Sequence, residues 1–176
     1  MNRYSSRRHK LDQQFLNEKL KNAASYDRIA GYFSSSILEV AGESIENVAG
    51  KVRVICNSGL SPADVAVANY AQKMKQEWCE FSPEEKYTSP ESSKHLSTLF
   101  RLLSSGKLEI RVIPDEIFGL MHGKAGVITY KDGSKTSFLG SINETKSAFT
   151  LNYEMLWEDD SEESIKWVQE EFDYFW

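Results

Sequence analysis

The chain has 176 residues, which is enough for the core of one domain and short for two. A hydrophobic share of 40% and an aromatic share of 12% exclude a disordered chain. The formal net charge of −5 excludes a uniformly basic surface, although it leaves room for a local cationic groove.

Helical and strand patterns alternate along the first half of the chain. Ser34 begins a segment that can cap a helix, and Gly50 is placed to end that helix. The expected elements are, in order, a helix at 10–24, a strand at 27–33, a helix at 37–49, a strand at 52–56 and a helix that begins at Pro62.

The second half begins with a polar stretch that we expect to be a surface loop, at residues 80–91. The Asp132-Gly133 pair predicts the turn of a β-hairpin. The expected elements are a helix that Gly106 ends, a strand at 108–113, hairpin strands at 124–130 and 136–140, a strand at 153–157 and a helix at 162–175. This order of elements predicts an α/β fold, with a mixed β-sheet flanked by helices on both faces.

The cellular setting also follows from the sequence. The apolar runs fall well short of the roughly 20 residues that a membrane-spanning helix requires. The basic N-terminal residues have no apolar run behind them, so we expect no secretory signal. The two cysteines offer at most one disulfide and no metal-ligand spacing. We therefore expect a cytoplasmic protein with no membrane contact, no bound metal and no cofactor.

The residues that carry chemistry gather around the predicted hairpin. In an extended segment alternate side chains share a face, so His122 and Lys124 point the same way. The hairpin then returns the chain beside them and delivers Ser141 and Asn143 close to that pair. Glu154, on the next strand, can reach the imidazole from behind. All five side chains are therefore expected in one site.

These residue types suit the cleavage of a phosphodiester without a metal. A histidine can attack phosphorus and form a covalent phosphohistidine, which divides one difficult step into two easier ones. An ammonium group and neutral donors can hold the phosphoryl oxygens, while a carboxylate fixes the tautomer of the imidazole. We assign catalytic roles to His122, Lys124, Asn143 and Glu154, and phosphate binding to Lys124, Ser141 and Asn143.

Two further residues follow the buried strand at 52–56. Asn57 and Ser58 could line the same cleft, because loops after strand ends often carry the sites of α/β sheets. A plain turn explains them equally well.

Three short motifs in this region resemble those of the phospholipase D superfamily in order and spacing: His122-Gly-Lys124, Gly140-Ser141-Ile-Asn143 and Glu154. The family motif also has an aspartate that would fall at position 129, where this chain has Thr129. The resemblance implies a phospholipase D-like fold. It also implies a site that needs two His-x-Lys motifs, with one histidine as the nucleophile and the other as the general acid.

This chain has one such motif, because neither His9 nor His95 has the motif around it. The resemblance therefore implies that a second copy of the chain supplies the other half-site. Two-fold pairing would bring the two His122 side chains together, so we expect a homodimer with the active site between its subunits.

The function expected from these arguments is that of a metal-independent phosphodiesterase, specifically a nuclease that acts on DNA, with RNA as an open possibility. The alternative is a non-catalytic nucleic-acid-binding or dimerisation module of a larger helicase-type protein. A hydrolase of phospholipids or other small diesters ranks last.

The segments 26–34 and 52–58 also resemble the N-terminal phospholipase D-like domains of bacterial helicases and restriction or defence proteins. The resemblance implies that residues 1–176 form a single domain, as a fragment of a longer protein with C-terminal helicase domains.

Overall fold

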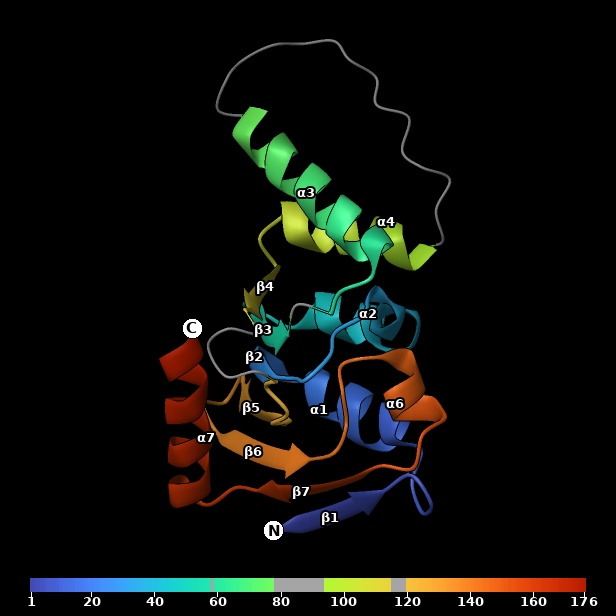
Figure 1. Ribbon diagram of the computed structural model, residues 1–176. Coiled ribbons are helices and arrows are strands. Elements are labelled where there is room, and N and C mark those ends of the chain that lie inside the picture. Colours follow the sequence, from blue (N-terminus) through green and yellow to red (C-terminus); the bar gives the residue numbers. More distant parts are fainter. Residues whose placement is uncertain (58, 78–93, 115–119) are drawn as a thin grey trace.

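The structure is a computed structural model that describes residues 1–57, 59–77, 94–114 and 120–176. Ser58 and the loop expected at 80–91 lie outside the described residues. Strands from the whole length of the described chain join one mixed sheet, in the order β1-β7-β6-β5-β2-β3-β4 (Figure 1). The strands are β1 (Asn2–Ser5), β2 (Ala23–Ile29), β3 (Val52–Asn57), β4 (Leu108–Ile113), β5 (Ala125–Tyr130), β6 (Lys135–Gly140) and β7 (Met155–Asp159).

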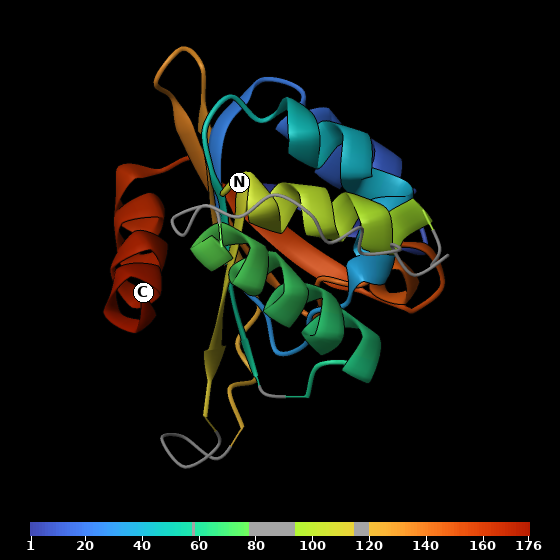
Figure 2. The ribbon, with the colours of Figure 1, turned by 90° about the horizontal axis from the view of Figure 1, so that it is seen from above.

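Helices cover both faces of this sheet, as the sequence predicted (Figure 2). The last helix, α7 (Glu162–Phe175), lies on one face. The opposite face carries η1 (Asp12–Asn17), α1 (Glu18–Leu20), η2 (Ser35–Ile37), α2 (Leu38–Asn47), α3 (Pro62–Glu77), α4 (Lys94–Ser104) and α6 (Lys146–Thr150). In the described part of the chain, no helix has the length and apolar character to cross a membrane.

Each face of the sheet has its own core. The larger core packs η1, α1, α2 and α4 against the sheet, with Phe15, Tyr26 and Phe138 among its largest buried side chains. The smaller core lies under α7, where Val168 and Phe172 pack against β2, β3 and β5. Burial on both faces explains the apolar run of β5, Gly126 to Ile128, and the buried positions of β2 and β3.

The central strand β2 differs from the strand expected at 27–33. It begins at Ala23, so the helix predicted for 10–24 was wrong for its last residues, and it ends at Ile29. The reason is tertiary: β2 pairs with β5 along its whole length, from Ala23 opposite Tyr130 to Ile29 opposite Ala125. Pairing with a long neighbour outweighs the local helical pattern.

The other strands agree more closely with the sequence. The strand at 108–113 was correct in both bounds, and both hairpin strands were found. The last strand lies at 155–159 rather than at 153–157, because its register is set by pairing with β6 and β1. β1 and α6 were not predicted from the sequence, because both are short.

Candidate active site

The hairpin of β5 and β6 brings the two predicted motifs together. Lys124 stands directly before β5, and Gly140 ends β6. The amide of Gly140 donates to the carbonyl of Lys124 at 3.0 Å, so the chain that carries His122 and the chain that leads to Asn143 leave the sheet side by side. We call residues 121–124 and 141–144 the two arms of the site.

Lys124 and Asn143 converge on the backbone at Gly31. A methyl group on Gly31 would stand 3.1 Å from Lys124 Nζ and 3.2 Å from Asn143 Oδ1. The amide of Tyr32 donates to Asn143 Oδ1 at 3.0 Å, which leaves the side-chain nitrogen of Asn143 as the group that can donate to an anion. Lys124 is 7% exposed, and its Nζ donates to the carbonyl of His122 at 2.8 Å.

A pocket of about 370 Å³ opens over these groups. Asn57 lies in its wall, and its side chain forms two hydrogen bonds with the backbone of Met121: Nδ2 donates to the carbonyl at 2.8 Å and Oδ1 accepts from the amide at 3.0 Å. Asn57 thereby anchors the residue next to His122. The residues around the pocket are Gly31, Tyr32, Asn57, Gly59, Leu120, His122, Lys124 and Asn143.

The remaining two predicted residues form a unit beside this pocket. The hydroxyl of Ser141 donates to the carboxylate of Glu154 and accepts from the amide of Met155 at 3.1 Å. The amide of Glu154 donates to Ser6 Oγ at 2.9 Å, so the N-terminal segment helps to hold this carboxylate. Among the described residues, no hydrogen bond joins Glu154 to the imidazole of His122, which is exposed.

Sequence reasoning missed the buried pair beneath the arms, Arg28 and Glu144. Arg28 is fully buried, and its Nε donates to Glu144 Oε2 at 2.8 Å. Its other nitrogens donate to the carbonyls of Ala125, at 3.0 Å, and Ile142. The available signal was a charged residue in an apolar strand pattern, but its partner lies 116 positions away in the sequence.

Thr129, which stands where the family motif has aspartate, lies far from these groups. It pairs with Lys135 beside the hairpin turn, at the opposite end of β5 from Lys124. The substitution therefore removes no group from the pocket.

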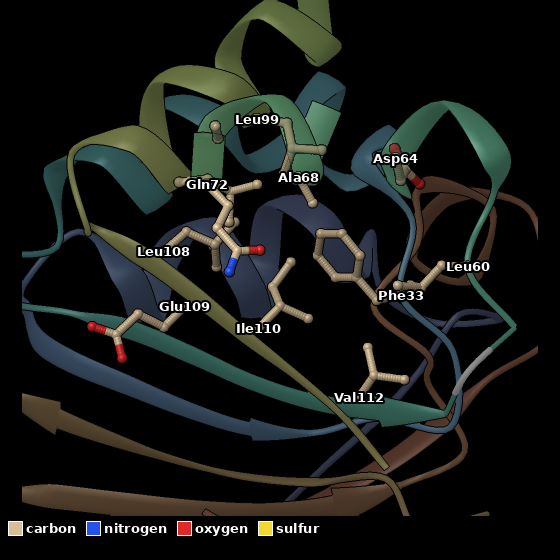
Figure 3. Close-up of a pocket in the computed structure, with 12 residues that line it drawn as sticks. Phe33, Leu60, Asp64, Ala68, Gln72, Leu99, Leu108, Glu109, Ile110 and Val112 are labelled. Atoms are coloured by element: carbon tan, nitrogen blue, oxygen red, sulfur yellow. The ribbon is translucent and has the colours of Figure 1, made fainter. Parts of the chain in front are cut away.

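A second pocket of about 300 Å³ lies between α3, α4 and β4 (Figure 3). Its walls are mainly apolar side chains, including Phe33, Leu99 and Ile110, and they hold none of the predicted site residues. Among the described residues, no cluster of three or more histidine, cysteine, aspartate or glutamate side chains could hold a metal ion.

The electrostatics of the first pocket depend on Lys124. Burial lowers the pKa of its ammonium group, and the positive charge of Arg28 lowers that pKa further, while Glu154 acts in the opposite direction. Lys124 therefore combines a buried position with a charged partner and a like-charged neighbour, a combination typical of functional sites.

Comparisons with known proteins bear on the family and the fold of this chain. The family described as "Cardiolipin synthase, PLD-like domain" matches residues 16–176. No curated protein matches the sequence. NucT from Helicobacter pylori is similar over 99% of this chain and 93% of its own, with a TM-score of 0.60 and 19% identity. A phospholipase D family member, Nuc from Salmonella typhimurium, is similar over 99% of this chain and 92% of its own, with a TM-score of 0.57 and 13% identity. The phospholipase D-like fold expected from the sequence is confirmed.

Lys124 should lose its proton below the ordinary lysine pKa of 10.5, because burial and Arg28 both disfavour the ammonium form. As the pH rises through that lowered pKa, the pocket loses its cation and its hold on an anion weakens. NMR titration of protein labelled with ¹³C-lysine, with the resonance assigned through Lys124→Gln, measures the value. A Lys124 pKa at or above 10.5 would contradict this reading of the site.

Proposed function

This chain belongs to the phospholipase D superfamily as a PLD-like domain, and on that basis we propose that it is a metal-independent phosphodiesterase whose substrate is DNA. The observation that carries the proposal is the pocket in which His122, Lys124 and Asn143 meet. It offers one nucleophile, one cation and one amide donor to the same anion.

The reaction follows from the chemistry of these groups. An imidazole nitrogen of His122 forms a bond to phosphorus, and the bond from phosphorus to the leaving oxygen breaks. A protonated histidine from a second copy of the chain gives its proton to that oxygen. Water then attacks the phosphohistidine, returns a proton to the second histidine and frees the first. Lys124 and Asn143 hold the non-bridging oxygens while charge develops on them.

Ser141 and Glu154 fit a supporting role in this scheme. Their hydrogen bond keeps a buried negative charge beside the half-site. In the proposed reaction, this carboxylate supplies negative charge near the imidazole while positive charge develops on the ring.

The wall of the pocket favours a nucleic acid over a lipid as the source of the phosphodiester. Tyr32 lines the pocket and is 37% exposed, which allows its ring to stack on a base. RNA carries the same phosphodiester group, so RNA and a phospholipid are tested beside DNA.

The half-site also requires a partner. His9 and His95, the other histidines of the chain, are both engaged elsewhere. His9 Nδ1 lies 3.3 Å from the carbonyl of Ser5, and His95 Nδ1 lies 3.1 Å from Glu39 Oε1. The second histidine of the reaction must therefore come from another molecule, and we propose that this is a second copy of the chain.

A candidate surface for this pairing lies on the sheet beside α7. Leu139 and Trp157 face each other across β6 and β7, and Met155 follows on the same face. These side chains are 37%, 44% and 41% exposed, respectively. Trp167, on α7, is 52% exposed. The backbone amide of Met155 donates a hydrogen bond to the hydroxyl of Ser141. The exposed apolar surface is therefore adjacent to the half-site.

The first test replaces the proposed nucleophile. His122→Ala should lower the cleavage of a DNA substrate by about 10³-fold or more, because no other group can form the covalent intermediate. His95→Gln is the control and should cleave like the wild type. Both wild-type and control cleavage should persist in a chelator. Cleavage that needs a metal, or that survives His122→Ala, contradicts the proposed mechanism.

The same assay separates the competing functions. Wild-type protein that binds DNA without cutting it would identify a binding module instead. Turnover of RNA or of a phospholipid in preference to DNA would overturn the proposed substrate.

The second test addresses the shared site. Trp157→Asp places a charge in the exposed apolar surface and should convert a dimer into a folded monomer that no longer cleaves DNA. Val65→Asp changes a residue of similar exposure, 39%, on α3 and should leave the dimer intact. Sedimentation velocity measures the assembly, and circular dichroism checks the fold. An active wild-type monomer, or a Trp157→Asp dimer, would rule out this interface.

A further inference from the structure

Arg28 contacts the arm at 141–144 and the first residue of β5, which directly follows the arm at 121–124. One guanidinium nitrogen donates to the carbonyl of Ala125, the residue after Lys124, at 3.0 Å. Another donates to the carbonyl of Ile142, the residue before Asn143. Because a guanidinium is a rigid planar fork, these two bonds fix the distance between the arms more tightly than a flexible ammonium could.

Glu144 completes the arrangement and extends it to the pocket wall. Its side chain is 2% exposed and accepts from Arg28 Nε and from the hydroxyl of Tyr26, the latter at 3.3 Å. Its backbone amide donates to the carbonyl of Tyr32 at 3.1 Å, and its carbonyl accepts from the amide of Ser34 at 3.1 Å. The pair therefore links the arms to the segment at Tyr32, whose backbone amide holds the side chain of Asn143.

We propose that Arg28 and Glu144 form a positioning clamp, which holds the two arms at the separation that one phosphate requires and balances the charge beneath Lys124. The catalytic part of this inference rests on the proposed function, whereas the structural part does not. Neither residue lines the pocket, so the clamp acts through Lys124 and Asn143.

A buried ion pair is a poor means of stabilising a fold. Removing two charges from water costs about as much as their attraction returns, and apolar residues of similar size often do as well. The bonds of this pair are directed at the two carbonyls that adjoin Lys124 and Asn143. Geometry at the site, rather than stability alone, accounts for a charged pair at this position.

The charges around Lys124 allow the clamp to be tested. Arg28, on β2, repels the ammonium group of Lys124, and Glu154, next to β7, attracts it. His122 lies on the same arm as Lys124. Glu144 neutralises Arg28 at 2.8 Å. Without that carboxylate the guanidinium would be unbalanced, its repulsion of Lys124 would grow, and the pKa of Lys124 would fall further.

The decisive variant is Glu144→Gln, which keeps the size of the side chain and removes its charge. The clamp predicts that the Lys124 pKa, followed by ¹³C-lysine NMR, falls by about half a unit or more relative to the wild type. The alkaline limb of kcat/KM for the hydrolysis of bis(4-nitrophenyl) phosphate should move to lower pH by a similar amount.

The chain offers a matched control in Asp27→Asn. Asp27 also lies on β2, but on the opposite face, where Arg53 donates to both of its oxygens at 2.7 and 2.6 Å. This variant unpairs an arginine on the neighbouring strand β3 and should also destabilise the fold, yet it should leave the Lys124 titration unchanged. Equal shifts in both variants, or no shift in Glu144→Gln, would overturn the proposal.

Arg28→Lys tests the geometric part, because an ammonium keeps the charge and loses the fork. We expect kcat to fall by about 10-fold to 10²-fold with a smaller change in KM, as happens when reacting groups are misplaced by fractions of an ångström. A folded Arg28→Lys with wild-type kcat would contradict the clamp. If the variant does not fold, Glu144→Gln still decides the question.

The NMR measurement also distinguishes a failure of the clamp from a failure of the proposed function. If the wild-type protein hydrolyses no phosphodiester, the proposed function fails, but the Lys124 titration in Glu144→Gln still supports or overturns the clamp. If hydrolysis is present and the Lys124 pKa does not respond, the function stands and the clamp fails.

Discussion

A guanidinium shut away from water must find acceptors for its N–H groups inside the protein, and Arg28 finds them at Ala125, Ile142 and Glu144. These acceptors lie in or directly next to the two arms, which carry the side chains proposed to bind phosphate. Satisfying one buried cation therefore also sets the arrangement of the pocket. The hairpin brings the arms together, and Arg28 determines how far apart they stay.

The pocket above this pair has the properties that an anion site needs. Lys124 is buried enough for its charge to act strongly, and Asn143 is held by the backbone at Tyr32. His122, the proposed nucleophile, is exposed, as an attack on a polymer would require. For the proposed reaction the arrangement is incomplete, because one imidazole cannot both attack phosphorus and protonate the leaving oxygen in the same step. The exposed apolar surface around Trp157, next to Ser141, suits the partner that this chemistry requires.

The sequence predicted the elements whose pattern is local and the motifs whose spacing is short. The hairpin could be read from Asp132-Gly133, and the placement of Lys124 beside Asn143 followed from it. The limits of β2 could not be read, because pairing with β5 decides them. The pairing of Arg28 with Glu144 could not be predicted for a similar reason, since a lone arginine in a strand does not indicate a partner 116 residues away. The mutual contact of Ser141 and Glu154 was also not anticipated.

The central claim is that His122 attacks phosphorus, and trapping the intermediate tests it most directly. DNA that carries ³²P in its backbone would be mixed with the protein, quenched in alkali and digested, and the labelled peptide identified by mass spectrometry. The account predicts a DNA-linked phosphoramidate on His122, stable in alkali and lost in acid. Rapid cleavage with no adduct under conditions that slow its hydrolysis, or an adduct on another residue, would contradict it.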